Sequence, residues 1–163
     1  MKNGLLVSAA AFLTLGLAAD EGRTVVRHVN PPELPRPNGY SHVVEVGAGR
    51  TIYVSGQIAM DAAGRVVGAG DVAAQTRQVF ENLKTALGAV DASLGHVVKI
   101  TVFMTDVSQL QRFREVRDSY FTQAPPPASS LVEVRRLARP ELLLEVEAVA
   151  FVPPAPSAAR RSR

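Results

Sequence analysis

The spacing of hydrophobic positions divides the middle of the chain into two kinds of segment. Short runs rich in β-branched and apolar residues predict strands. These runs cover residues 24–29, 41–46, 51–57, 97–104, 131–134 and 142–152. Two longer segments, which follow Asp71 and Asp106, carry apolar residues at steps of three and four and predict amphipathic helices capped by these aspartates. The predicted order is therefore β-β-β-α-β-α-β-β.

Each predicted helix has one apolar face. In the first helix this face comprises Val72, Thr76, Val79, Phe80, Leu83, Leu87 and Val90. In the second it comprises Val107, Leu110, Phe113, Val116 and Tyr120, and three prolines then stop the helix. Polar residues such as Gln75 fill the opposite side of the first helix. The Gly-rich residues 47–50, between two strand-like runs, predict a β-hairpin.

The alternation of strands and helices predicts a two-layer α+β domain over residues 23–152. Right-handed crossovers would place both helices on one face of a single mixed sheet and leave the other face uncovered. Along the last strand, one set of alternating residues is uniformly apolar, whereas the other mixes Glu145 and Glu147 with large apolar groups. A face of that composition favours oligomerisation.

The two ends of the chain differ from this domain. Residues 1–19 carry Lys2, then an uncharged apolar run and small residues, the order of a cleaved signal peptide. We therefore expect export to the periplasm or the medium, with a retained anchor or a buried helix as the alternatives. Residues 153–163 are rich in Pro, Ala and Arg and predict a disordered tail.

Charge is unevenly divided between the ends and the domain. The whole chain has 18 basic and 15 acidic residues and a pI near 9.7. Without Lys2 and the three arginines of the tail, 14 basic and 15 acidic residues remain. The high pI is thus a property of the ends and gives little support to nucleic-acid binding.

Chemistry cannot be assigned from isolated motifs. The chain has no cysteine, which excludes disulfides, thiolate metal sites and cysteine nucleophiles. Its three histidines, His28, His42 and His96, stand in separate elements without metal-ligand spacing. Glu145 and Glu147 suit acid–base work or structural ion pairs equally well. Taken alone, these residues indicate an oligomeric α+β domain.

Several segments in order nevertheless resemble one family. These are SGQI at 55–58, AAQTRQVFENL at 73–83, KITVFMTD at 99–106, and LVEV with EVEAVA at 131–134 and 145–150. From Arg23 to Val152 the chain resembles the Rid family of reactive-intermediate deaminases, also called YjgF-like. The resemblance implies a chorismate-mutase-like fold, a homotrimer with clefts between subunits, and no metal or organic cofactor. Deaminases of this family hydrolyse 2-imino acids, such as 2-iminopropanoate, to 2-oxo acids and ammonia.

The family's site residues carry over unevenly. The resemblance implies substrate binding by Tyr40, Ser55 and Gly56, and a water-positioning role for Glu145. The family's arginine after Pro-Ala is replaced here by Ser129, and an asparagine of the second helix is assigned to Arg114. An arginine binds a carboxylate through two charge-assisted hydrogen bonds, each contributing about 1.5–3 kcal/mol. Serine offers one neutral donor, and Arg114 is the candidate for a relocated cation.

The resemblance leaves three candidate functions. The first is binding of a small imine, enamine or 2-oxo acid metabolite between subunits, with weak or lost imine deaminase activity. The alternative is an active 2-iminobutanoate/2-iminopropanoate deaminase. RNA binding or cleavage is the third, and the absence of interleaved aromatic and basic residues disfavours it. We expect the chain itself and a small molecule as partners, with no nucleic acid and, in the mature form, no membrane.

Overall fold

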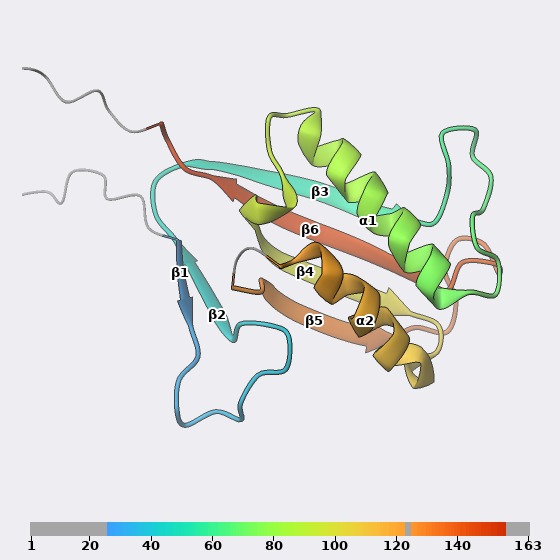
Figure 1. Cartoon of the computed structure of the whole chain (residues 1–163), viewed down its shortest axis with the longest axis horizontal. Helices are drawn as coiled ribbons and strands as arrows, with labels where there is room; N and C mark the ends of the chain where they lie inside the picture. Colours follow the sequence, from blue (N-terminus) through green and yellow to red (C-terminus); the bar gives the residue numbers. More distant parts are fainter. Residues whose placement is uncertain (1–25, 123–124, 156–163) are drawn as a thin grey trace, which may run out of the picture.

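The computed structural model describes residues 26–122 and 125–155. Its elements follow the predicted order (Figure 1). They are β1 (Val26–Val29), β2 (Val43–Val46), β3 (Arg50–Ile58), α1 (Val72–Gly88), β4 (Val97–Met104), α2 (Leu110–Tyr120), β5 (Ala128–Glu133) and β6 (Leu144–Val152). The predicted signal peptide at 1–19 and residues 156–163 of the predicted tail fall outside the described residues.

The described strands form two sheets, which corrects the expectation of one. The main sheet has the order β3-β6-β4-β5, with β5 parallel to β4 and the other pairs antiparallel. The predicted hairpin is wrong, because β2 pairs with β1 in a separate antiparallel ribbon. Gly49 lies against the Phe151 ring, where any side chain would clash, so the chain passes β6 closely. It enters β3 at that point and pairs with β6, beginning at Arg50 and Val152.

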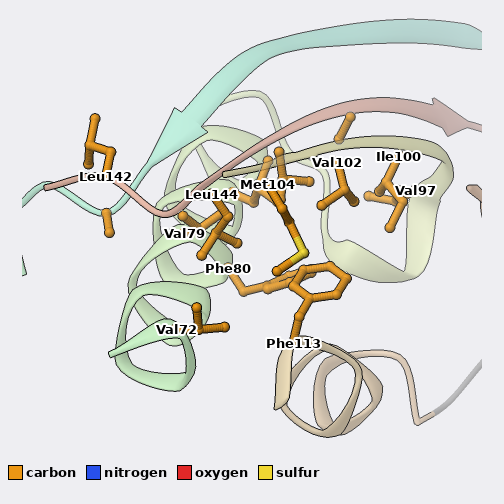
Figure 2. Packing of buried hydrophobic residues seen from close by; sticks show 14 of the residues in the cluster. Val72, Val79, Phe80, Val97, Ile100, Val102, Met104, Phe113, Leu142 and Leu144 are labelled. Carbon is orange, nitrogen blue, oxygen red and sulfur yellow. The ribbon is translucent and has the colours of Figure 1, made fainter. Parts of the chain in front are cut away.

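Both helices lie on the same face of the main sheet, as predicted (Figure 1). The Phe80 ring of α1 stacks on Tyr120 of α2 with centroids 4.9 Å apart. Beneath them, the apolar set of β6 is buried: Leu144, Val146, Ala148 and Ala150. Figure 2 shows the Met104 side chain extending from β4 towards Phe80 and Phe113. Each such large apolar side chain contributes about 1.5–3 kcal/mol through burial.

Polar side chains fix the helix starts and the loop before β6. Asp71 accepts hydrogen bonds from the backbone N–H groups of Ala73 and Ala74, as an N-cap does. Gln75, predicted to be solvated, is fully buried. Its Nε2 donates to the carbonyls of Gly68 and Glu141, and its Oε1 accepts from Leu143 N–H. These bonds satisfy backbone groups that α1 would otherwise bury without partners.

The other face of the main sheet is not covered by any helix within residues 26–122 and 125–155 (Figure 1). It holds a hollow of about 360 Å³ lined by Ser55, Lys99, Thr101, Glu147 and their neighbours. Tyr53 stands beside it with 80% of its surface exposed. Burial lowers the pKa of Lys99, whose Nζ donates to Ser130 Oγ at 2.7 Å. In the described part of the chain, no helix is long and apolar enough to cross a membrane.

Candidate functional site

A bulge in β3 displays Ser55 and Gly56. Val54 pairs with Ala148 and Gln57 pairs with Val146, so two residues of β3 stand opposite Glu147 alone. The Gln57 side chain donates to the Ser55 carbonyl at 3.1 Å. A bulge frees backbone groups from the ladder and redirects side chains, and bulges are frequent beside active sites.

Glu145 lies directly beside this bulge. A Cβ built on Gly56 would overlap the Glu145 carboxylate, so this carboxylate lies against bare backbone. Glu145 is half-buried and also borders an open hollow of about 740 Å³ lined by Arg136 and Pro140. A carboxylate in such a position can orient a water molecule and accept its proton. We name Ser55, Gly56 and Glu145 the bulge group.

At the opposite edge of the sheet, the segment that carries Tyr40 lies beside β5, the strand that carries Ser129. Ser41 forms a parallel bridge with Ala128, and its N–H donates to the Pro127 carbonyl at 3.0 Å. The Ser41 hydroxyl donates to the Pro126 carbonyl at 2.6 Å. These bonds hold Tyr40 next to the strand that carries Ser129.

Arg117 is a member of this region that the sequence analysis did not identify. Only 5% of its surface is exposed, although it is a charged residue of α2. Its Nε donates to Asp118 Oδ1 at 2.8 Å, and its Cζ lies 5.8 Å from the Phe113 ring centroid. A Cβ on Gly39 would overlap Arg117 Nη2, so the guanidinium occupies the space that a side chain before Tyr40 would fill.

Arg114 precedes Arg117 by about one turn of α2. Tyr120 follows Arg117 by the same spacing and reaches α1, where its hydroxyl donates to Glu81 Oε1 at 3.0 Å. Because three residues advance about 300° around a helix, Arg114 and Tyr120 flank Arg117 on opposite sides. Arg114 therefore lies on the side of α2 away from α1. We name Tyr40, Arg114, Arg117 and Ser129 the β5-edge group.

A simple spacing signal could have identified Arg117. It follows Phe113 by four residues, and residues at that spacing lie on the same face of a helix. Because Phe113 belongs to the predicted apolar face of the helix, the spacing places the charge of residue 117 on the inward side. Such a placement is rare for an arginine.

The two groups are separated within one chain. Glu145 pairs with Phe103, which pairs with Val132, three residues after Ser129. Strand spacing then puts the Cα atoms of Glu145 and Ser129 about 14 Å apart. Ser129 pairs with Ile100 beneath the helices, whereas Glu145 alternates with buried Leu144 and Val146 and points to the other face. A small molecule cannot touch both groups of the same chain.

The histidines serve local structure. His28 Nδ1 lies 3.1 Å from the Ser41 hydroxyl, and His42 Nε2 lies 2.8 Å from the Pro35 carbonyl. His96 Nδ1 accepts from Ser93 N–H at 3.1 Å. Over the residues that the structure describes, no three His, Asp or Glu side chains gather in a way suited to a metal ion.

One family model matches the part of the chain that contains the main sheet, both helices and both groups of residues. The family model described as Endoribonuclease L-PSP matches residues 33–152. The chain belongs to the Rid family, also called YjgF-like. The α+β fold expected from the family resemblance is confirmed, because solved Rid structures share the arrangement of two helices on a mixed sheet.

Individual relatives carry different names. A protein of Myxococcus xanthus, Protein DfrA, is 40% identical over 129 residues, covering 78% of this chain and 97% of its own. A 2-iminobutanoate/2-iminopropanoate deaminase of Salmonella typhimurium is 38% identical, covering 67% of this chain and 85% of its own. The crystal structure of YyfB, a Rid family protein of unknown function from Yersinia pestis, has a TM-score of 0.73 at 37% identity, covering 77% of this chain and 98% of its own.

Proposed function

We propose that the protein is a homotrimer that binds a small imine, enamine or 2-oxo acid in clefts between subunits and hydrolyses imines weakly. One observation carries this proposal. The bulge group and the β5-edge group face opposite sides of the sheet, about 14 Å apart. A cleft that unites them needs the bulge group of one subunit and the β5-edge group of another.

The composition of the open sheet face supports assembly. Tyr53 is 80% exposed and Val132 is 46% exposed, both large apolar groups on this side of the molecule or at its edge. Lys99 lies among them and is already partly desolvated. A second copy covering this face would bury apolar surface, which stabilises an oligomer by about 25 cal/mol per Å².

Weak hydrolysis follows from the replacement of the family's arginine by Ser129. A guanidinium fixes a carboxylate in position through two parallel hydrogen bonds, and serine supplies one neutral donor. The bulge group would still serve the reaction. Glu145 would accept a proton from water as the water oxygen bonds to the imine carbon, and would pass this proton to the imine nitrogen. The hydroxyl proton of the resulting carbinolamine then also moves to the nitrogen as the C–N bond breaks, which releases ammonia and a 2-oxo acid. Without an arginine at position 129, the substrate carboxylate is not held at the family's position, and the attack of water on the imine carbon loses its alignment.

Active deamination is the competing function, and the intact bulge group favours it. Both functions can be tested on freshly generated 2-iminobutanoate in a coupled assay, beside an arginine-bearing family member. We expect turnover at least a hundredfold lower than that of the arginine-bearing protein. Turnover comparable to that of the arginine-bearing protein would overturn the binding proposal and identify the protein as an active deaminase.

The variant Ser129→Arg sharpens this test. We expect it to raise turnover at least tenfold, because it restores two charge-assisted bonds. Ser129→Gln is the matched control, since it adds length and polarity without charge. The molar mass in solution, measured by light scattering, should be three times that of the chain. A monomer that still binds 2-oxobutanoate would contradict the inter-subunit cleft.

A further inference from the structure

We propose that Arg117, with Arg114 beside it, binds the carboxylate of the ligand in place of the arginine that Ser129 replaces. This inference rests on the proposed function and assigns the ligand its charge: an anionic metabolite with a carboxylate rather than a neutral imine. The binding group comes from α2 instead of from β5.

The first argument is that α2 buries positive charge with too few partners. Across the described residues, two buried side-chain nitrogens lack a hydrogen-bond partner: Nε of Arg114 and Nη2 of Arg117. Asp118 Oδ1 lies 2.7 Å from Arg117 Nη2, outside hydrogen-bond geometry, and the same oxygen already accepts from Nε. Asp118 itself is 58% exposed, so water weakens this ion pair. A buried cation with unused donors is costly unless another anion satisfies it.

The second argument is that the surroundings hold the Arg117 guanidinium beside the segment that carries Tyr40. Gly39, at a φ of +72°, leaves no side chain where the guanidinium lies. The Phe113 ring supports the guanidinium from the helix at 5.8 Å. Gly39 is bonded to Tyr40, and Ser41 is bridged to Ala128, so the guanidinium and Ser129 border one short segment. The cation therefore lies where the resemblance expects ligand contacts.

The third argument concerns the kind of anion. Guanidinium groups present parallel N–H donors that match the two oxygens of a planar carboxylate. Two arginines at a spacing of three residues project about 60° apart from one helix and can reach one such group. An acidic side chain of a neighbouring subunit is the competing occupant.

The test compares a carboxylate with its neutral analogue on the full-length protein. Isothermal titration calorimetry would measure binding of 2-oxobutanoate and of methyl 2-oxobutanoate to the wild type and to Arg117→Gln. We expect the wild type to prefer the carboxylate. Arg117→Gln should weaken 2-oxobutanoate binding by about 10- to 100-fold and leave the ester unchanged. Arg112→Gln is the matched control, because Arg112 is exposed on the same helix and should bind like wild type.

The outcomes separate the inference from the proposed function. If the wild type binds neither compound, the proposed function fails and this inference fails with it. If 2-oxobutanoate binds Arg117→Gln as it binds wild type, or the ester binds wild type equally well, only the role of Arg117 is overturned. A loss of trimer in Arg117→Gln would assign Arg117 to a neighbouring subunit's acid and overturn it too. If Arg117→Gln does not fold, Arg117→Lys is the variant to measure, because lysine keeps the positive charge but lacks the parallel N–H donors of a guanidinium. Unchanged affinity of Arg117→Lys for 2-oxobutanoate would overturn the proposal.

Discussion

The bulge group and the β5-edge group are built by different means. Ser55 and Gly56 are displayed by the backbone of β3, through one extra residue in the ladder with β6, and Glu145 packs on the glycine. At the β5 edge, the backbone holds Tyr40 near Ser129, but the charge comes from side chains of α2. The first group keeps every residue that the Rid resemblance expects, whereas the second departs from it at two positions.

This difference shows which part of a binding site can be rebuilt by substitution. A bulge with a glycine depends on register and on the absence of a side chain, so few sequences reproduce it. A cation needs only to reach a certain point in space, and a residue on any adjacent element can supply it. In the proposed function, the bulge group keeps its chemical role and the residues that bind the carboxylate are rearranged.

Gly56→Ala is expected to have the largest effect on activity, because it changes the bulge group, whose geometry few other sequences can reproduce. The new Cβ would overlap the Glu145 carboxylate and displace the flexible end of that side chain. Residual imine hydrolysis should fall by about 100-fold or more, the scale of a lost general base. Thermal stability should change little, since a flexible carboxylate moves at low cost.

Gly88→Ala is the control for this variant. Gly88 ends α1, and a Cβ there meets no atom within 4 Å. It should retain wild-type hydrolysis and equal or raised stability, because alanine favours the helix by up to about 1 kcal/mol. If Gly56→Ala also retains wild-type hydrolysis, Glu145 does not act where the bulge group puts it.

Much of this architecture follows from periodicity in the sequence. The spacing of Phe80, Leu83 and Leu87 predicts the buried face of α1, and the alternation along β6 predicts its buried set; both are confirmed. Strand pairing is harder to predict from the sequence, because the local sequence does not specify long-range partners. The sequence therefore predicts a hairpin at 47–50, although β3 pairs with β6, about a hundred residues away.

Buried polar residues were the other source of error. The sequence predicts Gln75 on the solvated side of α1, because amide side chains are mostly exposed. Its three hydrogen bonds go to backbone groups at residues 68, 141 and 143, which the sequence does not show to be neighbours. The inward position of Arg117 could be predicted from its spacing to Phe113, but the space that its guanidinium fills exists only when residues 39–41 lie beside β5. Sequence-based prediction identified the bulge group by resemblance, and only the structure separates it from the β5-edge group.

Gly39→Ala is expected to have an intermediate effect and tests the rebuilt half. A Cβ at this position would push Arg117 Nη2 away from the segment that carries Tyr40. Binding of 2-oxobutanoate should weaken about tenfold, by the loss of one charge-assisted bond. The positive φ also costs about 1–2 kcal/mol of stability for alanine, measurable by urea denaturation.

Gly70→Ala separates the two consequences of that change. Gly70 has a φ of +75°, close to that of Gly39, but a Cβ there meets nothing within 4 Å. Both variants should therefore lose similar stability, while only Gly39→Ala loses affinity. Equal affinity in the two variants would show that backbone strain, not the guanidinium, accounts for any change at the β5 edge.

Tyr120→Phe is expected to have the smallest effect and asks how firmly α2 holds its arginines. The Lys84 ammonium and then the Tyr120 hydroxyl hold the pKa of Glu81 below its usual value of 4.5. A lowered folded-state pKa stabilises the protein above pH 4.5, and this contribution is lost as the pH falls through the folded value. Without the hydroxyl, we expect a loss of about 0.5 kcal/mol at pH 7 in urea denaturation, because the hydrogen bond is exposed. The difference from wild type should shrink as the pH falls below 4.5. A difference that instead grows on acidification would mean that the Tyr120 hydroxyl does not stabilise the Glu81 carboxylate, and that the packing of Tyr120 on Phe80 alone positions α2.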